Sequence, residues 1–247
     1  MLDTGNVLFG GSRVSRRVRG AVHIDAMNAM GYAAMNVAER DLRWGMDTLV
    51  ERQSEARFPF LSATLVISGT DAPLHQPYAL FDVDGVPVAV MGLAISQIPA
   101  EHRRPLVSGE MIDTLDPIAT ARRLLPEIRE RADVVVVLSH MGIEQDIELA
   151  RQVQGIDAIL GGVSRRVEDV PFMAEGADTV ITCAGYQGQW LGVLTLSFDV
   201  QGNVTAFDGE TLSLTDEFPD DPDMVERVDG WIDRANEIEA KTKGVGG

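Results

Sequence analysis

The chain has 247 residues, of which 45% are hydrophobic, and its formal net charge is −17. This length allows one large domain or two small ones with a substantial core. The negative charge disfavours electrostatic binding to nucleic acid or anionic membranes, and no apolar run is long enough to predict a transmembrane helix. The single cysteine, Cys183, excludes an internal disulfide, and its apolar neighbours predict a buried thiol.

Strand and helix signals alternate in the N-terminal part. The expected elements are a strand end and Gly-rich loop over 2–9, helices over 21–38 and 41–53, and a strand over 60–67. The helices are indicated by apolar residues near helical spacing, and the strand by its apolar run. Asp84-Gly85 is the strongest short turn signal, and it predicts a hairpin between strands at 78–83 and 86–93.

The middle of the chain predicts a parallel α/β arrangement. Asp116-Pro117 has the N-cap and N1 residues of a helix that extends to about Ala132, with a kink or break expected at Pro126. The elements expected next are a strand over 134–138, a helix over 146–154 and a strand over 158–160. His140 follows the first of these strands and Gly161-Gly162 the second, so both lie where strand ends present functional groups.

Antiparallel strands are expected in the C-terminal third. The predicted elements are strands over 179–184, 192–198 and 204–207, with a turn at Gly202-Asn203. An acidic amphipathic helix is expected from Asp220 onward. The whole pattern predicts two packed sheets with helices outside them.

Two groups of basic side chains have no clear motif. A run near the N-terminus consists of Arg13, Arg16, Arg17 and Arg19. It is either a solvated loop or helix face, or a patch for an anion or an acidic partner. His23, His75 and His102 show no ligand spacing, and we expect surface positions for them.

Six segments in order carry a resemblance to a known family. They are LDTGNVLFG (2–10), GYAAMNVAERDLRWG (31–45), FPFLSATL (58–65), VAVMGLAI (88–95), the run from DVVVVLSHMGIEQDIEL to GIDAILGG (133–162) and AGYQGQWLGVLTLSFD (184–199). Together they resemble the metallophosphoesterase domain of the bacterial 5′-nucleotidase and UDP-sugar hydrolase family over almost the whole chain. The resemblance implies an α/β (α+β) fold, a four-layered αββα sandwich of two mixed sheets. It also implies a pair of divalent metals that activate water and clamp a phosphate.

The family's metal ligands are carried over one by one. Its bridging Asp falls on Asn6, the Asn of its Asn-His-Glu motif on Glu39, and the catalytic His of that motif on Arg40. The Asp that orients the catalytic His falls on Arg43, whereas the His of Leu-Ser-His is retained as His140. The family's opening Asp-x-His motif has no counterpart, because the sequence begins after it.

The last family segment also departs from the pattern. Gly-Gly-His-Ser-His becomes Gly161-Gly162-Val163-Ser164-Arg165, so both ligands of that segment are replaced. A guanidinium is always protonated and cannot ligate a metal. We therefore expect an eroded dinuclear site with no cofactor, in a domain that is catalytically inactive and acts as a binding or scaffold module.

Two interpretations of the replaced site stay open. The simpler interpretation is an ion pair between Glu39 and Arg40 or Arg165 that fills the former metal site. The other is a pocket for a phosphate or carboxylate, since arginine forks suit such oxyanions. The candidate anion-binding residues are Arg40, Arg165, Arg166 and His140.

The alternative function is an active metal-dependent phosphoric-ester (nucleotide) hydrolase, encoded by a truncated chain. It would hold Mn, Zn or Mg at an altered or mononuclear site made by His140, Glu39 and Asn6. We expect a metallophosphoesterase-like domain over 1–215 and an acidic linker helix and tail over 216–247, without a C-terminal nucleotidase domain. The resemblance implies a periplasmic or cell-surface location, whereas the lack of a signal peptide implies a cytoplasmic one if residue 1 is the true start.

Overall fold

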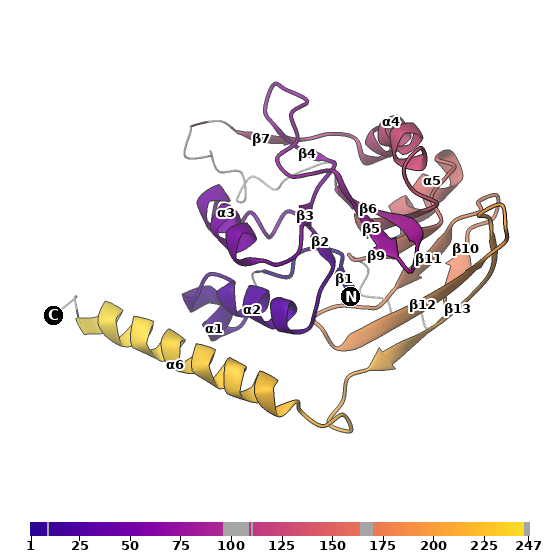
Figure 1. The fold of residues 1–247 in the computed structure, drawn as a ribbon. Helices are drawn as coiled ribbons and strands as arrows, with labels where there is room; N and C mark the ends of the chain where they lie inside the picture. Colours follow the sequence, from indigo (N-terminus) through magenta and orange to yellow (C-terminus); the bar gives the residue numbers. More distant parts are fainter. Residues whose placement is uncertain (9, 96–108, 110, 164–169, 245–247) are drawn as a thin grey trace.

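In the computed structural model, the described residues are 1–8, 10–95, 109, 111–163 and 170–244. Two β-sheets pack face to face, and helices cover their outer faces (Figure 1). This arrangement confirms the predicted α/β class with two sheets inside and helices outside. Within the described residues, no helix has both the length and the apolar character needed to cross a bilayer.

The larger sheet has six strands in the order β10-β11-β9-β8-β6-β5. Their bounds are β5 (Tyr78–Val83), β6 (Val86–Ala94), β8 (Val134–His140), β9 (Ala158–Gly161), β10 (Phe172–Met173) and β11 (Val180–Cys183). The four central strands are parallel, and the two edge strands are antiparallel to their neighbours. Val135 and Val137 pack with helices α4 (Pro117–Arg129) and α5 (Ile143–Gln152), while Leu138 packs toward the other sheet. Both faces of β8 are therefore buried, which explains its unbroken valine run.

Two features that were predicted from local sequence signals are present in the structure. The Asp116 carboxylate accepts a hydrogen bond from the backbone N–H of Ala119 at 2.7 Å, which confirms the predicted N-cap of α4. Asp84 and Gly85 have φ angles of 52° and 87°, which confirms the predicted tight turn between β5 and β6. The expected break at Pro126 is wrong, because α4 continues through it to Arg129.

The smaller sheet consists of the parallel strands β1 (Leu2–Asp3), β2 (Ala34–Asn36) and β3 (Phe60–Leu61). Its outer face is covered by helices α1 (Arg13–Arg17), α2 (Ala21–Ala29) and α3 (Met46–Glu55) (Figure 1). Its inner face meets the larger sheet through the buried side chains of Ala34, Leu61, Val90 and Leu138. The sheet contact thus places the ends of β1, β2 and β8 near one another.

Two predicted elements are divided in the structure. The expected helix over 21–38 ends at Ala29, because Gly31 takes a left-handed φ of 71°, and the chain then enters β2. The expected strand over 60–67 is two strands, β3 and β4 (Leu65–Ile67), and β4 pairs with β7 (Ile112–Thr114) away from the small sheet. The chain bends between them, where Leu65 N–H donates to Ser62 Oγ at 3.2 Å.

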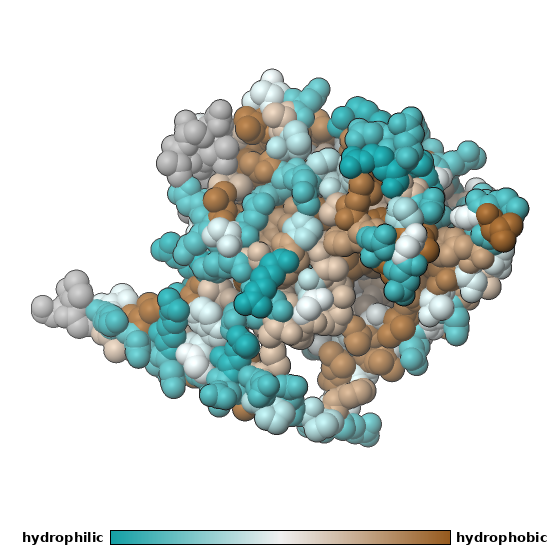
Figure 2. All heavy atoms as spheres, viewed as in Figure 1, coloured by the Kyte–Doolittle hydropathy of each residue, from teal (hydrophilic) through white to brown (hydrophobic). Residues whose placement is uncertain are grey.

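The C-terminal third forms a long hairpin and a long helix. Strands β12 (Trp190–Phe198) and β13 (Val204–Ser213) pair in antiparallel register, so β13 is longer than the predicted 204–207. Apolar side chains gather along this hairpin in Figure 2. Helix α6 (Pro222–Gly244) then runs alongside α1 and α2 (Figure 1).

Buried polar residues correct one expectation about the histidines. His75 is only 5% exposed and packs beside Phe60, with the ring centroids 6.2 Å apart, so its predicted surface position is wrong. His23 is half-buried and contacts the Val7 carbonyl at 3.0 Å, and His102 lies outside the described residues. Cys183 is buried, as predicted.

Candidate functional site

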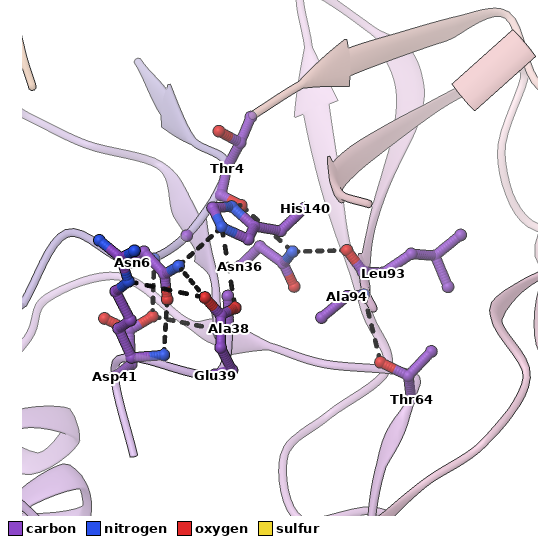
Figure 3. A network of polar contacts seen from close by, with 12 residues as sticks. Thr4, Asn6, Asn36, Ala38, Glu39, Asp41, Thr64, Leu93, Ala94 and His140 are labelled. Carbon is purple, nitrogen blue, oxygen red and sulfur yellow. Dashed lines mark hydrogen bonds and ion pairs between the residues drawn. The ribbon is translucent and has the colours of Figure 1, made fainter. Parts of the chain in front are cut away.

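Two loops and a strand end meet where β1, β2 and β8 end. The loop after β1 carries Asn6, the loop after β2 carries Glu39 and Arg40, and β8 itself ends at His140. Figure 3 shows the side chains of Asn6, Glu39 and His140 pointing toward one another. The structure therefore brings together all three residues that the sequence offered as possible metal ligands.

Asn6 forms the centre of this cluster. Its side-chain nitrogen Nδ2 lies 2.7 Å from Glu39 Oε1 and 2.7 Å from His140 Nε2. Its Oδ1 accepts a hydrogen bond from the backbone N–H of Arg40 at 2.8 Å. That backbone donor determines which way the amide faces, because the opposite orientation would place Nδ2 against an N–H. Both amide hydrogens and the amide oxygen thus have partners within the protein.

Contacts at both ring nitrogens indicate the tautomer of His140. Nδ1 lies 3.1 Å from the Thr4 carbonyl oxygen, so it carries the hydrogen and donates. Nε2 then presents its lone pair to the Asn6 amide. Burial lowers the pKa of His140, with a smaller opposing effect from Glu39, whose Oε2 lies 3.8 Å from Nε2. A neutral imidazole with its hydrogen on Nδ1 satisfies this network, and no second proton on Nε2 is needed.

Asp41 is a buried carboxylate that the sequence reasoning missed. It accepts hydrogen bonds from the backbone N–H groups of Asn6 at 2.9 Å, Leu8 at 3.1 Å and Ala38 at 3.0 Å. Burial raises its pKa to about 7, although these three donors act in the opposite direction. The signal was available, because Asp41 is aligned with the Glu of the family's Asn-His-Glu motif. Its role is to tie the Asn6 loop to the loop after β2.

Two glycines allow the loops to close around His140. A Cβ at Gly162 would lie 2.9 Å from His140 Nδ1 and 2.6 Å from Thr4 Oγ1. Gly5 has a φ of 110°, and a Cβ there would lie 2.9 Å from Ala38 Cβ. Any larger residue at either position would push the strand ends apart.

A second buried carboxylate lies beneath the site. Ser139, next to His140, donates its hydroxyl to Asp146 Oδ1. A Cβ at Gly161 would lie 2.7 Å from Asp146 Oδ2, so this carboxyl fills the space between the ends of β8 and β9. Burial raises the pKa of Asp146 to about 7. Asp146 therefore anchors the two strand ends that support His140 and Gly162.

The arginines of the site do not converge as Asn6, Glu39 and His140 do. Arg40 Nε lies 3.8 Å from Glu39 Oε1, and the Arg40 side chain is 68% exposed. Arg43 points its guanidinium over the Trp44 ring, 5.8 Å from the centroid, and is exposed. Arg165 and Arg166 lie outside the described residues. The predicted pairing of Glu39 with Arg40 is present as a long contact between an exposed guanidinium and a largely buried carboxylate.

The donor set does not match a pair of dications. Such a site needs several carboxylates or imidazoles and a shared anionic bridge. Among the described residues, no group of three or more His, Cys, Asp or Glu side chains is placed to hold a metal ion. At the bridging position Asn6 presents N–H donors to Glu39 and His140, whose lone pairs would otherwise bind a cation.

Comparison with known proteins gives the family. No protein-family model matches the sequence. The chain is 27% identical to the human 5′-nucleotidase over 94% of this chain and 43% of that protein. It is 29% identical to the trifunctional nucleotide phosphoesterase protein YfkN of Bacillus subtilis over 99% of this chain and 19% of that protein. The chain thus spans less than half the length of these two relatives.

Solved structures give the same result. The 5′-nucleotidase precursor of Thermus thermophilus superposes with a TM-score of 0.79 at 27% identity, over 96% of this chain and 49% of that one. The sulfate thiohydrolase SoxB of Thermus thermophilus, solved with glycerol, superposes with a TM-score of 0.84 at 23% identity, over 96% and 43% of the two chains. The second likeness is one of fold alone. The sequence matches and the shared fold together support a 5′-nucleotidase-family metallophosphoesterase domain.

Proposed function

We propose that this 5′-nucleotidase-like domain has an eroded metal site and serves as a binding module, without phosphohydrolase activity. One observation carries the proposal. The Asn6 amide donates to Glu39 Oε1 and His140 Nε2, both at 2.7 Å, and so occupies one lone pair on each of these two potential metal ligands. A neutral amide supplies no negative charge to hold two dications together. Apart from Glu39 Oε2, the polar side-chain atoms of Asn6, Glu39 and His140 have hydrogen-bond partners within the protein.

The ligand class we propose is a small anion that carries a phosphate or a carboxylate. Support comes from Arg40, whose side chain is 68% exposed at the rim of the cluster and is paired only loosely with Glu39. Its guanidinium can therefore turn toward an oxyanion in bidentate geometry. Arg165, Arg166 and His140 are the other proposed contacts, on the basis of sequence position.

Hydrolysis is tested with the purified protein, an aryl phosphate and nucleoside 5′-monophosphates, in the presence of Mn²⁺ or Zn²⁺. We expect no turnover above the rate with a chelator added. Clear turnover that the chelator abolishes would refute the proposed loss of activity.

Anion binding is tested by titrating inorganic phosphate and a simple carboxylate while following backbone amide NMR signals. We expect shifts at Asn6 and Arg40, and a dissociation constant at least about fivefold weaker in Arg40→Ala. Arg57→Ala is the matched control, because Arg57 is an exposed arginine outside the cluster. Equal binding by the two variants would remove Arg40 from the proposed site.

A specific observation favours the alternative of a mononuclear metal site. Glu39 Oε2 is buried, accepts no hydrogen bond from the described residues and lies 3.8 Å from His140 Nε2. A carboxylate oxygen and an imidazole nitrogen are suitable zinc or manganese ligands. Stoichiometric binding of either metal by the wild type, lost in Glu39→Gln, would favour this alternative over the closed network.

The domain limits and the location are part of the same proposal. We propose that residues 1–215 form the metallophosphoesterase-like unit and that 216–247 form an accessory helix and tail. Family resemblance suggests a periplasmic or cell-surface location. Fractionation of the native host with an antibody to the domain would test this, and recovery with the cytoplasmic fraction would contradict it.

A further inference from the structure

Helix α6 is held against α1 and α2 by a small apolar contact, with ion pairs and hydrogen bonds at its edges. The buried members of this contact are Val18, Ala21 and Ala235, and the partly buried members are Val14, Val22, Trp231 and Ile238. The α6 residues in this set lie at helical spacing, so one stripe of the helix makes the contact.

Charge complementarity surrounds the stripe. Arg13 bonds Glu239 at 3.2 Å and also Asn236, and Arg17 lies 3.8 Å from Glu239. At the other end, Asp25 accepts from Arg227 and from the Trp231 indole N–H, both at 2.8 Å. Arg13 and Arg17 of the basic run therefore contact polar and acidic side chains of the chain's own helix α6.

The covering helix is attached by little else. Within α6 only Ala235, at 1% exposure, is fully buried among the described side chains. The connecting residues 214–221 are all exposed. In Figure 1 α6 lies along the outside of the helical layer, with its C-terminal end extending beyond α1. Few contacts must break for α6 to leave this face.

The face beneath α6 is held in place by the body of the domain. Arg52, from α3, donates to the carbonyls of Val18 at 3.1 Å and Arg19 at 3.3 Å. Ser15 donates its hydroxyl to the Leu8 carbonyl at 3.3 Å, and Ile24 is part of the core beneath α2. These contacts do not involve α6, so the α1–α2 face keeps its shape when α6 departs.

We propose that the α1–α2 face is a docking site for an acidic amphipathic helix of a partner protein, and that α6 is the occupant supplied by the chain itself. The fitting helix carries an aromatic, a small and an aliphatic residue on one stripe, as in Trp231, Ala235 and Ile238, followed by a carboxylate that reaches Arg13 and Arg17. Because a tethered helix has an effective concentration in the millimolar range, a partner helix binds only where α6 is loosened.

The test uses the full chain and a fluorescently labelled peptide of residues 220–242 as the partner helix. Ala235→Glu places a carboxylate in the buried contact, so it releases α6 and leaves the α1–α2 face unchanged. We expect this variant to bind the peptide with a dissociation constant below about 100 µM, and the wild type to bind at least about tenfold more weakly. Ala240→Glu adds the same charge at an exposed position of α6 and is expected to behave like the wild type.

Charge and oligomeric state give the remaining outcomes. Adding Arg13→Glu and Arg17→Glu to Ala235→Glu is expected to weaken peptide binding at least about tenfold, because it replaces the two positive charges that contact Glu239 with negative ones. No peptide binding by a cooperatively folded Ala235→Glu chain, or binding insensitive to the two arginines, would overturn the proposal. A dimer of Ala235→Glu that excludes the peptide would also overturn it, because a second copy would then occupy the face.

A second measurement covers the case in which Ala235→Glu does not fold. A protease site in place of residues 216–219 lets α6 be cut from the wild-type interface after folding. The cut helix is expected to remain bound and then to exchange with excess labelled peptide. A cut helix that dissociates at once, with no peptide taken up, would show that the face does not recognise such helices.

Discussion

Buried carboxylates and loop side chains play different parts at the strand ends. Asp41 and Asp146 hold the framework, since one binds three backbone N–H groups and the other joins the ends of β8 and β9. Asn6 instead donates its amide hydrogens to Glu39 and His140. Asp41 and Asp146 thus bind groups of the protein. At the positions of the family's metal ligands, by contrast, the side chains differ from those that two metals require. The framework contacts therefore do not involve the side chains at the metal-ligand positions.

The largest effect is expected from breaking the framework at Asp41. Asp41→Ala would leave the N–H groups of Asn6, Leu8 and Ala38 without their acceptor in a buried place. We expect the free energy of unfolding to fall by about 3 kcal/mol or more, measured by urea denaturation. Asp41→Asn keeps one acceptor oxygen and should lose less. A loss below about 1 kcal/mol in Asp41→Ala would show that the loops are held by other contacts.

A smaller effect is expected from restoring an acid at the centre of the cluster. Asn6→Asp would place a carboxylate at hydrogen-bond distance from Glu39 Oε1 in place of an N–H donor. We expect the free energy of unfolding to fall by about 2 kcal/mol at pH 7. Thermal unfolding measured with and without Mn²⁺ would sharpen the comparison, because two carboxylates and His140 could then bind a cation. The melting temperature of the variant should rise with Mn²⁺ while that of the wild type does not, and the reverse pattern would contradict the account.

A pH effect of about 1 kcal/mol is expected from His75. Burial lowers its folded-state pKa from 6.5 to about 4, so the unfolded chain binds the proton first as the pH falls. Its contribution to stability is thus fully present above pH 6.5 and is lost as the pH falls toward 4. Between pH 7 and pH 5.5 the loss is about 1 kcal/mol. His75→Phe should flatten this part of the stability profile, and an unchanged slope would mean that His75 is not buried as a neutral group.

The smallest effect is expected at the rim of the cluster. Arg40→Ala removes an exposed guanidinium that is 3.8 Å from Glu39, so it should change the free energy of unfolding by less than about 0.5 kcal/mol. Urea denaturation at low and high salt measures this directly. A loss above about 1 kcal/mol would place Arg40 in the framework.

The sequence predicted the fold better than it predicted the site. Buried strands such as β8, the Asp84-Gly85 turn and the Asp116 cap depend on neighbouring residues, so local patterns were sufficient. The division of 60–67 into β3 and β4 depends on pairing with β7, which is about 50 residues away, and no local signal reports it. In the same way His75 reads as a surface residue until its neighbours in space are known.

At the site, residue identity was predictable and hydrogen-bond direction was not. The resemblance to the family selected Asn6, Glu39 and His140, which do converge. That Asn6 donates both hydrogens to the other two depends on the Arg40 backbone N–H, whose position only the folded loop determines. Asp41 was missed because only the family's metal-ligand positions were considered, whereas its partners are backbone N–H groups.

The most direct measurement of the closed network is anomalous scattering from a crystal soaked in Mn²⁺. The account predicts no manganese peak between Glu39 and His140, with the Asn6 amide still hydrogen-bonded to both side chains. A well-occupied pair of manganese ions there, with Asn6 turned to coordinate through Oδ1 and Arg40 directed into solvent, would contradict it.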